Sequence, residues 1–235
     1  MSAGAGAIVL QVFTRVPVAG RVKTRLLPAL GAEGALRVHR VLAERALQAA
    51  MVVCATVPGV RCELWFDGDA QHRWLADMCL RHPGLRTRGQ VGSDLGARMH
   101  HALAAGCADL AVAGDRGCAG AVLFGTDCPG LDARYLEGAV RALAGGADLV
   151  LGPVEDGGYV LVGLRRPMPE LFEGVPWSTP AVLATTLAIA ARHALTVVQL
   201  PMQWDVDVPA DLPRLAQLGI PGIEPGDPPE DAGAG

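Results

Sequence analysis

The chain has 235 residues, and its 20 Lys and Arg against 24 Asp and Glu give a formal net charge of −4 at pH 7. This acidic balance argues against a general nucleic-acid-binding protein, which needs a basic surface. Hydrophobic residues make up 51% of the chain and charged residues 19%, which excludes a wholly disordered protein. No stretch offers the ~18 uninterrupted apolar residues of a membrane span. The length fits one α/β domain.

Cysteine usage indicates a reducing compartment. The chain has 6 cysteines, scattered and without a Cys-x-x-Cys pair. The spacing of Cys79 and His82 resembles that of a pair of zinc ligands. The sequence offers no second such pair to complete a zinc site, so packed thiols are favoured. The first apolar run is not preceded by a basic segment, so no secretory signal is expected. These features predict a cytoplasmic protein.

Apolar runs and helical stripes alternate over residues 7–220, which are predicted to form one domain. Strands are expected at residues 7–14, 61–66, 85–89, 120–125, 148–151, 159–164 and 196–200. Helices are expected at about 32–51, 70–80, 93–105 (capped by Ser93), 134–143, 180–193 and 209–218. This alternation predicts a mostly parallel sheet covered on both faces. Residues 1–6 and 221–235 are small or rich in Pro, Gly and acids, and are predicted to be flexible.

A basic loop follows the first strand. It contains 4 of the 20 basic residues of the chain, namely Arg15, Arg21, Lys23 and Arg25. Ligands of such sheets bind in the loops beyond the strand ends, and phosphate oxygens are the natural partners of clustered cations. Gly20 would let the backbone approach a ligand closely. The GxxxxGK[ST] spacing of a Walker loop is absent, and the alternative is a solvated basic loop.

Carboxylates follow two other expected strands. Asp127 stands at the tip of the 120–125 strand, where it could hold a divalent metal or a ribose hydroxyl, or form a turn before Pro-Gly. Asp207 follows the late strand and could complete the coordination of a metal held by Asp127, or cap the next helix. Cys128 lies beside Asp127, but no histidine is close in sequence, so a nucleophile is not supported.

Two further segments leave alternatives open. Asp156 precedes a Gly-Gly pair, which fits either close approach of the backbone to a ligand or a hairpin turn. Trp177 lies beside an expected helix cap and would either line an acceptor pocket or pack. The Asp-x-Asp pair formed by Asp67 and Asp69 is interpreted as structural, with Asp69 capping the following helix.

Six segments taken in order resemble one bacterial family. They are FTRVPVAGRVKTRL (13–26), QVGSDLGARM (90–99), FGTDCPGL (124–131), LGPVEDGGYVLVGL (151–164), VPWST (175–179) and WDVDVPADL (204–212). The family is a GT-A-like one, often labelled glycosyltransferase of arsenosugar-biosynthesis type and long described as a domain of unknown function. It is related to phospholactate guanylyltransferases and molybdenum-cofactor nucleotidyltransferases. The resemblance implies the nucleotide-diphospho-sugar transferase fold, a three-layer α/β/α sandwich.

The resemblance also implies roles for residues on the donor side. Gly20, Lys23 and Arg25 would hold the nucleotide phosphates. Asp127 would be the metal-binding acid at the strand tip, and Asp207 the second, late one. The implied cofactor is Mg²⁺ or Mn²⁺.

Other matched positions concern the rest of the site. Asp94 and Gly96 would border the nucleoside or the acceptor. Asp156, Gly158 and Tyr159 would shape the acceptor side.

The chain departs from the family pattern at two places. Arg15 stands where the family usually has lysine, which keeps the charge. Val208-Pro-Ala-Asp-Leu212 replaces a common Thr-Pro-Glu-Asp-Leu, so the start of the last helix is expected to be weaker.

The predicted protein is a metal-dependent transferase that uses a nucleotide-activated donor and a small-molecule acceptor, with no nucleic-acid or membrane partner. Lys23 would stabilise the developing negative charge, and Asp156 would be the general base toward an acceptor hydroxyl.

Glycosyl transfer from a nucleotide sugar is the first interpretation. Nucleotidyl transfer from a nucleoside triphosphate, with release of pyrophosphate, is the second and is favoured by the dense cationic loop. A nucleotide-binding module without turnover is the third. The sequence does not indicate an oligomeric state.

Overall fold

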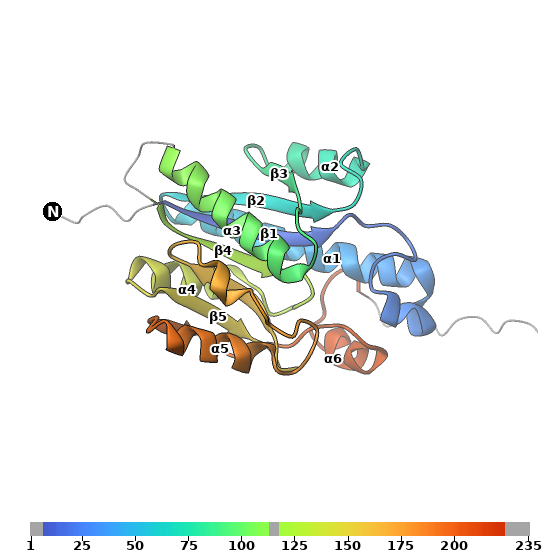
Figure 1. Ribbon diagram of the computed structural model, residues 1–235. Helices are drawn as coiled ribbons and strands as arrows, with labels where there is room; N and C mark the ends of the chain where they lie inside the picture. The colour runs from blue at the N-terminus through green and yellow to red at the C-terminus, as the bar shows by residue number, and fades with distance from the viewer. Residues whose placement is uncertain (1–6, 113–117, 224–235) are drawn as a thin grey trace, which may run out of the picture.

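Seven strands form one sheet in the order β3-β2-β1-β4-β6-β5-β7 in the computed structural model, which describes residues 7–112 and 118–223 (Figure 1). β6 runs antiparallel to β4 and β5, and the other neighbouring pairs are parallel. The strands are β1 (Ala7–Arg15), β2 (Val60–Asp67), β3 (Arg86–Gly89), β4 (Cys118–Gly125), β5 (Leu149–Pro153), β6 (Tyr159–Leu164) and β7 (Val197–Gln199). This confirms the predicted α/β class and mostly parallel sheet.

Helices cover both faces of the sheet. They are α1 (Leu27–Thr56), α2 (Arg73–Arg81), α3 (Leu95–Val112), α4 (Ala133–Ala144), α5 (Val182–Arg192) and α6 (Leu212–Ala216). α1, α2 and α4 pack on one face and α3 and α5 on the other, which gives the three layers (Figure 1). In the described part of the chain, no helix combines the length and the apolar character needed to cross a membrane.

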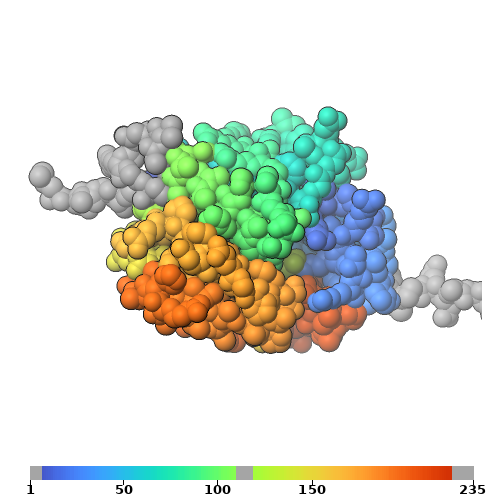
Figure 2. Space-filling view, in the orientation of Figure 1, coloured from blue at the N-terminus to red at the C-terminus, as the bar shows by residue number. Residues whose placement is uncertain are grey.

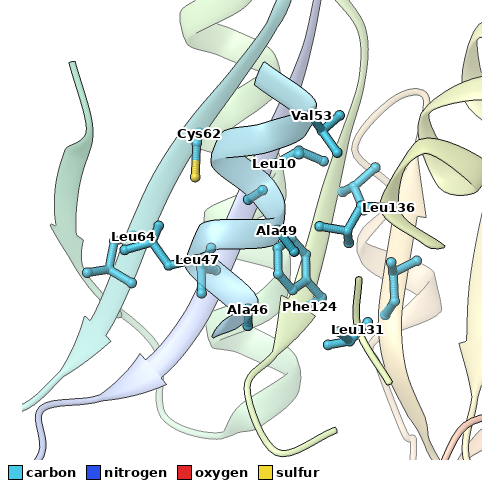
Figure 3. Packing of buried hydrophobic residues seen from close by; sticks show 14 of the residues in the cluster. Leu10, Ala46, Leu47, Ala49, Val53, Cys62, Leu64, Phe124, Leu131 and Leu136 are labelled. Carbon is cyan, nitrogen blue, oxygen red and sulfur yellow. The ribbon is translucent and has the colours of Figure 1, made fainter. Parts of the chain in front are cut away.

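The larger core lies between the sheet and α1, α2 and α4. Leu10 and Phe124 on neighbouring strands are fully buried, and Leu136 of α4 packs in the same cluster (Figure 3). α1 presents Ala46 and Ala49 to the sheet, so its backbone can approach closely. The many alanines of the sequence therefore serve helix-to-sheet packing.

Two predicted helix caps are wrong in detail. Ser93 does not cap α3, because Asp94 lies one residue closer and its Oδ1 accepts a backbone N–H of the first turn at 2.8 Å. Asp69 does not cap α2, because its carboxylate closes a turn before the helix begins. His72 takes the capping position instead, accepting a backbone N–H through Nδ1 at 3.3 Å.

A smaller third cluster joins two segments that are far apart in the sequence. Leu26 after the basic loop packs with Val38 of α1, and both pack with Val206 and Leu215 from the end of the domain. This cluster brings the basic loop against the segment before α6.

The predicted flexible residues 1–6 and 224–235 lie outside the described residues, whereas 221–223 are described.

Candidate functional site

A cleft of about 770 Å³ opens at the edge of the sheet where β1, β2 and β4 end. The turn between β5 and β6 lies at the same edge, and the segment before α5 forms the far wall. Figure 2 shows α3 (green), the residues before α5 (orange) and the residues after β1 (blue) bordering one another on one side of the molecule. Of the residues predicted from the sequence, the cleft is lined by Arg15, Lys23, Arg25, Asp127, Asp156, Gly158, Tyr159, Trp177 and Asp207.

Lys23 lies between the two predicted metal acids. Its ammonium nitrogen is 2.6 Å from Asp127 Oδ1 and 3.7 Å from Asp207 Oδ1. It also donates a hydrogen bond to the Val206 carbonyl oxygen at 2.5 Å. The Lys23 side chain is only 4% exposed, and its backbone is left-handed, with φ 48°. The ammonium therefore serves as a counter-ion inside the protein.

The other cations of the basic loop are placed differently. Arg25 is 70% exposed and its guanidinium is 3.3 Å from Asp207 Oδ2, so it can turn toward a ligand. Arg15 is paired with Asp67 Oδ2 at 3.4 Å. Arg21 is exposed and does not line the cleft. Gly20 does not line it either, but its φ of 74° favours glycine in the turn that leads to Lys23.

A third carboxylate was missed by sequence reasoning. Asp205 lines the cleft beside Asp127 and Asp207, and its Oδ1 is buried without a hydrogen-bond partner. Burial raises the pKa of Asp205 to about 7, and the neighbouring Asp127 carboxylate acts in the same direction. A backbone hydrogen bond of 3.0 Å from Val206 to the Asp127 carbonyl oxygen holds the two segments together.

The three carboxylates have the oxygen chemistry that Mg²⁺ and Mn²⁺ prefer. The buried Asp205 oxygen without a partner fits a cation nearby. Among the described residues, however, no three His, Cys, Asp or Glu side chains stand together as a ready-made metal site. The Lys23 ammonium lies between two of the acids, Asp127 and Asp207.

Further polar groups that sequence reasoning missed line the same cleft. Asp67, interpreted above as structural, pairs with Arg98 of α3 at 3.2 Å, in addition to Arg15. The Gln90 amide donates to two backbone carbonyl oxygens, each at 3.1 Å. His39 of α1 contacts the Arg15 carbonyl oxygen at 3.0 Å, and burial lowers its pKa. Sequence reasoning assigned none of them a role at the site, and only the fold brings them to the cleft.

The opposite wall is formed by the β5–β6 turn and aromatic side chains. Asp156 Oδ1 accepts a hydrogen bond from the Gly158 N–H at 2.9 Å, so the segment is both a hairpin turn and a cleft wall. Tyr159 meets Trp177 edge to face, with ring centroids 6.3 Å apart. Trp177 also stacks on Phe172 at 6.4 Å. Trp177 therefore packs and also lines the cleft, and its role toward an acceptor stays a prediction.

Asp94 and Gly96 do not line the cleft. Asp94 caps α3, as described above. A Cβ at Gly96 would lie 2.6 Å from Nε1 of Trp177, so glycine at this position lets the indole ring pack on the start of α3. Their expected role at the nucleoside or acceptor stays a prediction, and both residues help to build the far wall.

Asp211 fixes the loop that carries Asp207. Its Oδ2 accepts the backbone N–H groups of Asp207 and Val208, each at 2.8 Å. The 208–212 segment departs from the family pattern but retains Asp211. The hydrogen bonds of Asp211 therefore offset the weakness that was expected at this helix start. Asp211→Ala is expected to lower the free energy of unfolding by about 1 kcal/mol, and Asp211→Asn by less, because Asn keeps an acceptor. Urea unfolding of both variants would measure this, and equal losses would contradict the assigned role.

The family model described as "Uncharacterized protein conserved in bacteria (DUF2064)" matches residues 50–179, which is more than half of the chain. No curated protein matches the sequence.

Solved structures share the fold. A "putative nucleotide-diphospho-sugar transferase" from Desulfovibrio desulfuricans G20 is 30% identical, with a TM-score of 0.76 over 91% of this chain and 88% of that one. A 4-diphosphocytidyl-2C-methyl-D-erythritol synthase from Anaerococcus prevotii is 9% identical, with a TM-score of 0.54 over 92% and 98% of the two chains. Glucosyl-3-phosphoglycerate synthase from Mycobacterium tuberculosis is 12% identical, with a TM-score of 0.50 over 95% and 78%. The last two show the fold alone. The GT-A-like fold predicted from the sequence is confirmed.

Proposed function

This chain belongs to the bacterial family described as "Uncharacterized protein conserved in bacteria (DUF2064)", and from that premise we propose that it is a metal-dependent transferase acting on a nucleotide-activated donor and a small acceptor. The observation that carries the proposal is the meeting of Lys23, Asp127, Asp205 and Asp207 at the carboxyl edge of the sheet. The 30% identical structure bears the description of such a transferase, which supports the class. The cytoplasmic location expected from cysteine usage is part of the proposal.

The donor side provides charges of both signs. Asp127 and Asp207, with Asp205 beside them, would hold Mg²⁺ or Mn²⁺, which when bound stabilises negative charge on a leaving phosphate. Arg25, exposed at the cleft, would contact donor phosphates directly. Lys23 reaches the same phosphates only if it leaves its carboxylate partners. Arg15 and Arg98, joined through Asp67, would limit the space for the nucleoside.

The acceptor side consists of the β5–β6 turn and Trp177. We assign Asp156 as the general base, because it is an exposed carboxylate that lines the cleft. Gly158, Tyr159 and Trp177 would hold the acceptor so that its hydroxyl faces Asp156. The aromatic rings suit the apolar face of a sugar or another small ring-containing acceptor.

Stabilisation by ligands tests the donor class. The protein would be melted with a panel of nucleoside triphosphates and nucleotide sugars, with and without Mn²⁺. A true donor at ~100 times its dissociation constant adds about 2.7 kcal/mol to the free energy of unfolding, which raises the melting temperature clearly. The proposal expects one donor class to act, and only with metal. If no nucleotide raises the melting temperature, the proposed function is contradicted, and a protein that does not bind nucleotides is favoured.

Product analysis decides between the two chemistries. Glycosyl transfer moves the sugar to the acceptor oxygen and releases a nucleoside diphosphate, whereas nucleotidyl transfer breaks the α–β phosphoanhydride bond and releases pyrophosphate. The description of the 30% identical structure favours the first. The loop from Arg15 to Arg25, with 4 of the 20 basic residues of the chain, favours the second, because a triphosphate carries more charge. Pyrophosphate among the products of a labelled donor would reject glycosyl transfer, and bound donor without any product would indicate a binding module.

A further inference from the structure

Lys23 is distinguished by its residue type as well as its position. It is the only lysine in the chain, since all the other residues among the 20 Lys and Arg are arginines. An ammonium is a compact point charge, whereas a guanidinium is a broad planar fork. The enclosed space between Asp127 and Asp207 suits the compact group, because the side chain there is only 4% exposed.

Most of the hydrogen-bonding capacity of this ammonium is used within the protein. A lysine ammonium has three donors and no acceptor. Around Lys23 stand three oxygen partners within the protein, namely Asp127 Oδ1 at 2.6 Å, Asp207 Oδ1 at 3.7 Å and the Val206 carbonyl oxygen at 2.5 Å. The contacts with Asp127 and Val206 are at hydrogen-bond distance and use two of the three donors, whereas Asp207 lies at ion-pair distance.

The same oxygens are the ones that a divalent cation would need. Mg²⁺ requires oxygen ligands at about 2.1 Å in near-octahedral geometry, and Asp127 Oδ1 cannot offer the same lone pairs to a metal and to an ammonium. A second positive charge would also be repelled by the ammonium, whose side chain is 4% exposed beside carboxylates that are 47% and 48% exposed. A metal that uses Asp127 Oδ1 and Asp207 Oδ1 therefore competes with the clasped Lys23 ammonium for the same two oxygens.

We propose that Lys23 is the resident counter-ion of Asp127 and Asp207, and that a divalent cation enters between these carboxylates only when the ammonium leaves them. The inference rests on the proposed function, since it takes Asp127 and Asp207 as metal ligands. Its consequence is cooperative loading. Metal alone binds weakly because it must displace the ammonium, whereas donor phosphates attract the released ammonium and so favour entry of the metal.

Direct Mn²⁺ binding without nucleotide tests the proposal. The paramagnetic resonance signal of free Mn²⁺ would be titrated with the wild-type protein, Lys23→Met and Lys23→Gln. Both variants remove the charge, and the glutamine variant keeps a hydrogen-bond donor near the Val206 carbonyl oxygen. Each is expected to bind Mn²⁺ about tenfold or more tightly than the wild type, because the positive charge that lies 2.6 Å from Asp127 Oδ1 is removed. Equal or weaker binding by a folded variant would overturn the inference.

Two controls separate the possible causes. Arg25→Gln also removes a positive charge beside Asp207, but from a side chain that is 70% exposed, so a much smaller gain in Mn²⁺ affinity is expected. Asp127→Asn in the Lys23→Gln background should lose the gain. If wild type and variants bind Mn²⁺ equally well, the inference fails and the proposed function stands. If nucleotide binds but no variant binds Mn²⁺, the metal part of the proposed function fails as well.

A second measurement needs no variant at position 23. Because Lys23 is the only lysine, an amine-reactive ester followed by peptide mass spectrometry reports on it alone, with the α-amino group as internal reference. Labelling of Lys23 in the wild-type protein is expected to be slow and to speed up severalfold at Mn²⁺ concentrations that the resonance titration shows to be saturating. An unchanged rate with metal bound would mean that ammonium and metal share the site, which would overturn the inference.

Discussion

Asp127→Asn is expected to reduce turnover by at least about 100-fold, since loss of the proposed metal ligand should exceed the ~10–100-fold cost of changes around such ligands. The substitution keeps the size of the side chain and removes the charge that holds Lys23 at 2.6 Å. It should also abolish the metal-dependent part of nucleotide binding. Initial rates with the identified donor and melting curves with donor and Mn²⁺ would measure both effects.

Asp132→Asn is the matched control for this variant. Asp132 lies five residues further on and caps α4 through a hydrogen bond of 2.7 Å to a backbone N–H, outside the cleft. Asparagine is an equally good cap, so neither stability nor turnover is expected to change appreciably. Wild-type turnover by Asp127→Asn would show that the acid at the strand tip has no part in the reaction.

Gly157→Ala is expected to cause the largest loss of stability among single-methyl changes at the site. Gly157 has φ 87°, and a Cβ there would lie 2.3 Å from the Pro180 carbonyl oxygen. The left-handed backbone costs a non-glycine residue about 1–3 kcal/mol, and the forced shift costs about 1–3 kcal/mol more. Because the Gly157 carbonyl oxygen accepts the backbone N–H of Leu183 at 2.9 Å, the variant should also displace the wall that carries Trp177.

Gly146→Ala isolates the backbone contribution. Gly146 has φ 101° but open space within 4 Å of the position of its Cβ. Urea unfolding is therefore expected to show a larger loss for Gly157→Ala than for Gly146→Ala, by about 1–3 kcal/mol. Equal losses of unfolding free energy would mean that the segment around Pro180 moves away from the added methyl group at little cost, and that the β5–β6 turn does not hold it in place.

The elements were predictable because each has a local signal. The apolar run at 7–14 became β1, and the polar and apolar stripes of 32–51 lie within α1, which begins earlier and bends at Gly31. The strand order was not predictable, because it depends on packing between segments far apart in the sequence. The antiparallel β6 had a partial signal, since Asp156 and the glycines after it are typical of a hairpin.

The candidate site was predictable where residues directly follow strands. Arg15, Asp127 and Asp156 all follow this rule and all line the cleft. The direction of the Lys23 side chain was not, because a left-handed backbone at a lysine leaves no trace in the sequence. Asp205 was missed because the sequence analysis assigned a role in the 204–207 segment to Asp207 alone. Only the burial of the Asp205 oxygen reveals it.

The reversed direction of β6 has a consequence for how the protein can diversify. β6 lies between β4 and β5, so one tight turn and the segment from β6 to α5 form an entire wall of the cleft. The charged wall comes instead from segments after β1, β2 and β4 and before α6. Substitutions or insertions within residues 157–182 therefore alter one wall while the ion pairs of Lys23, Arg15 and Arg25 remain intact, whereas Glu155 pairs with Arg214 of α6 at 2.8 Å and has to be kept. A lineage could exchange its acceptors by changing this stretch alone, and a laboratory library confined to it would preserve the donor apparatus.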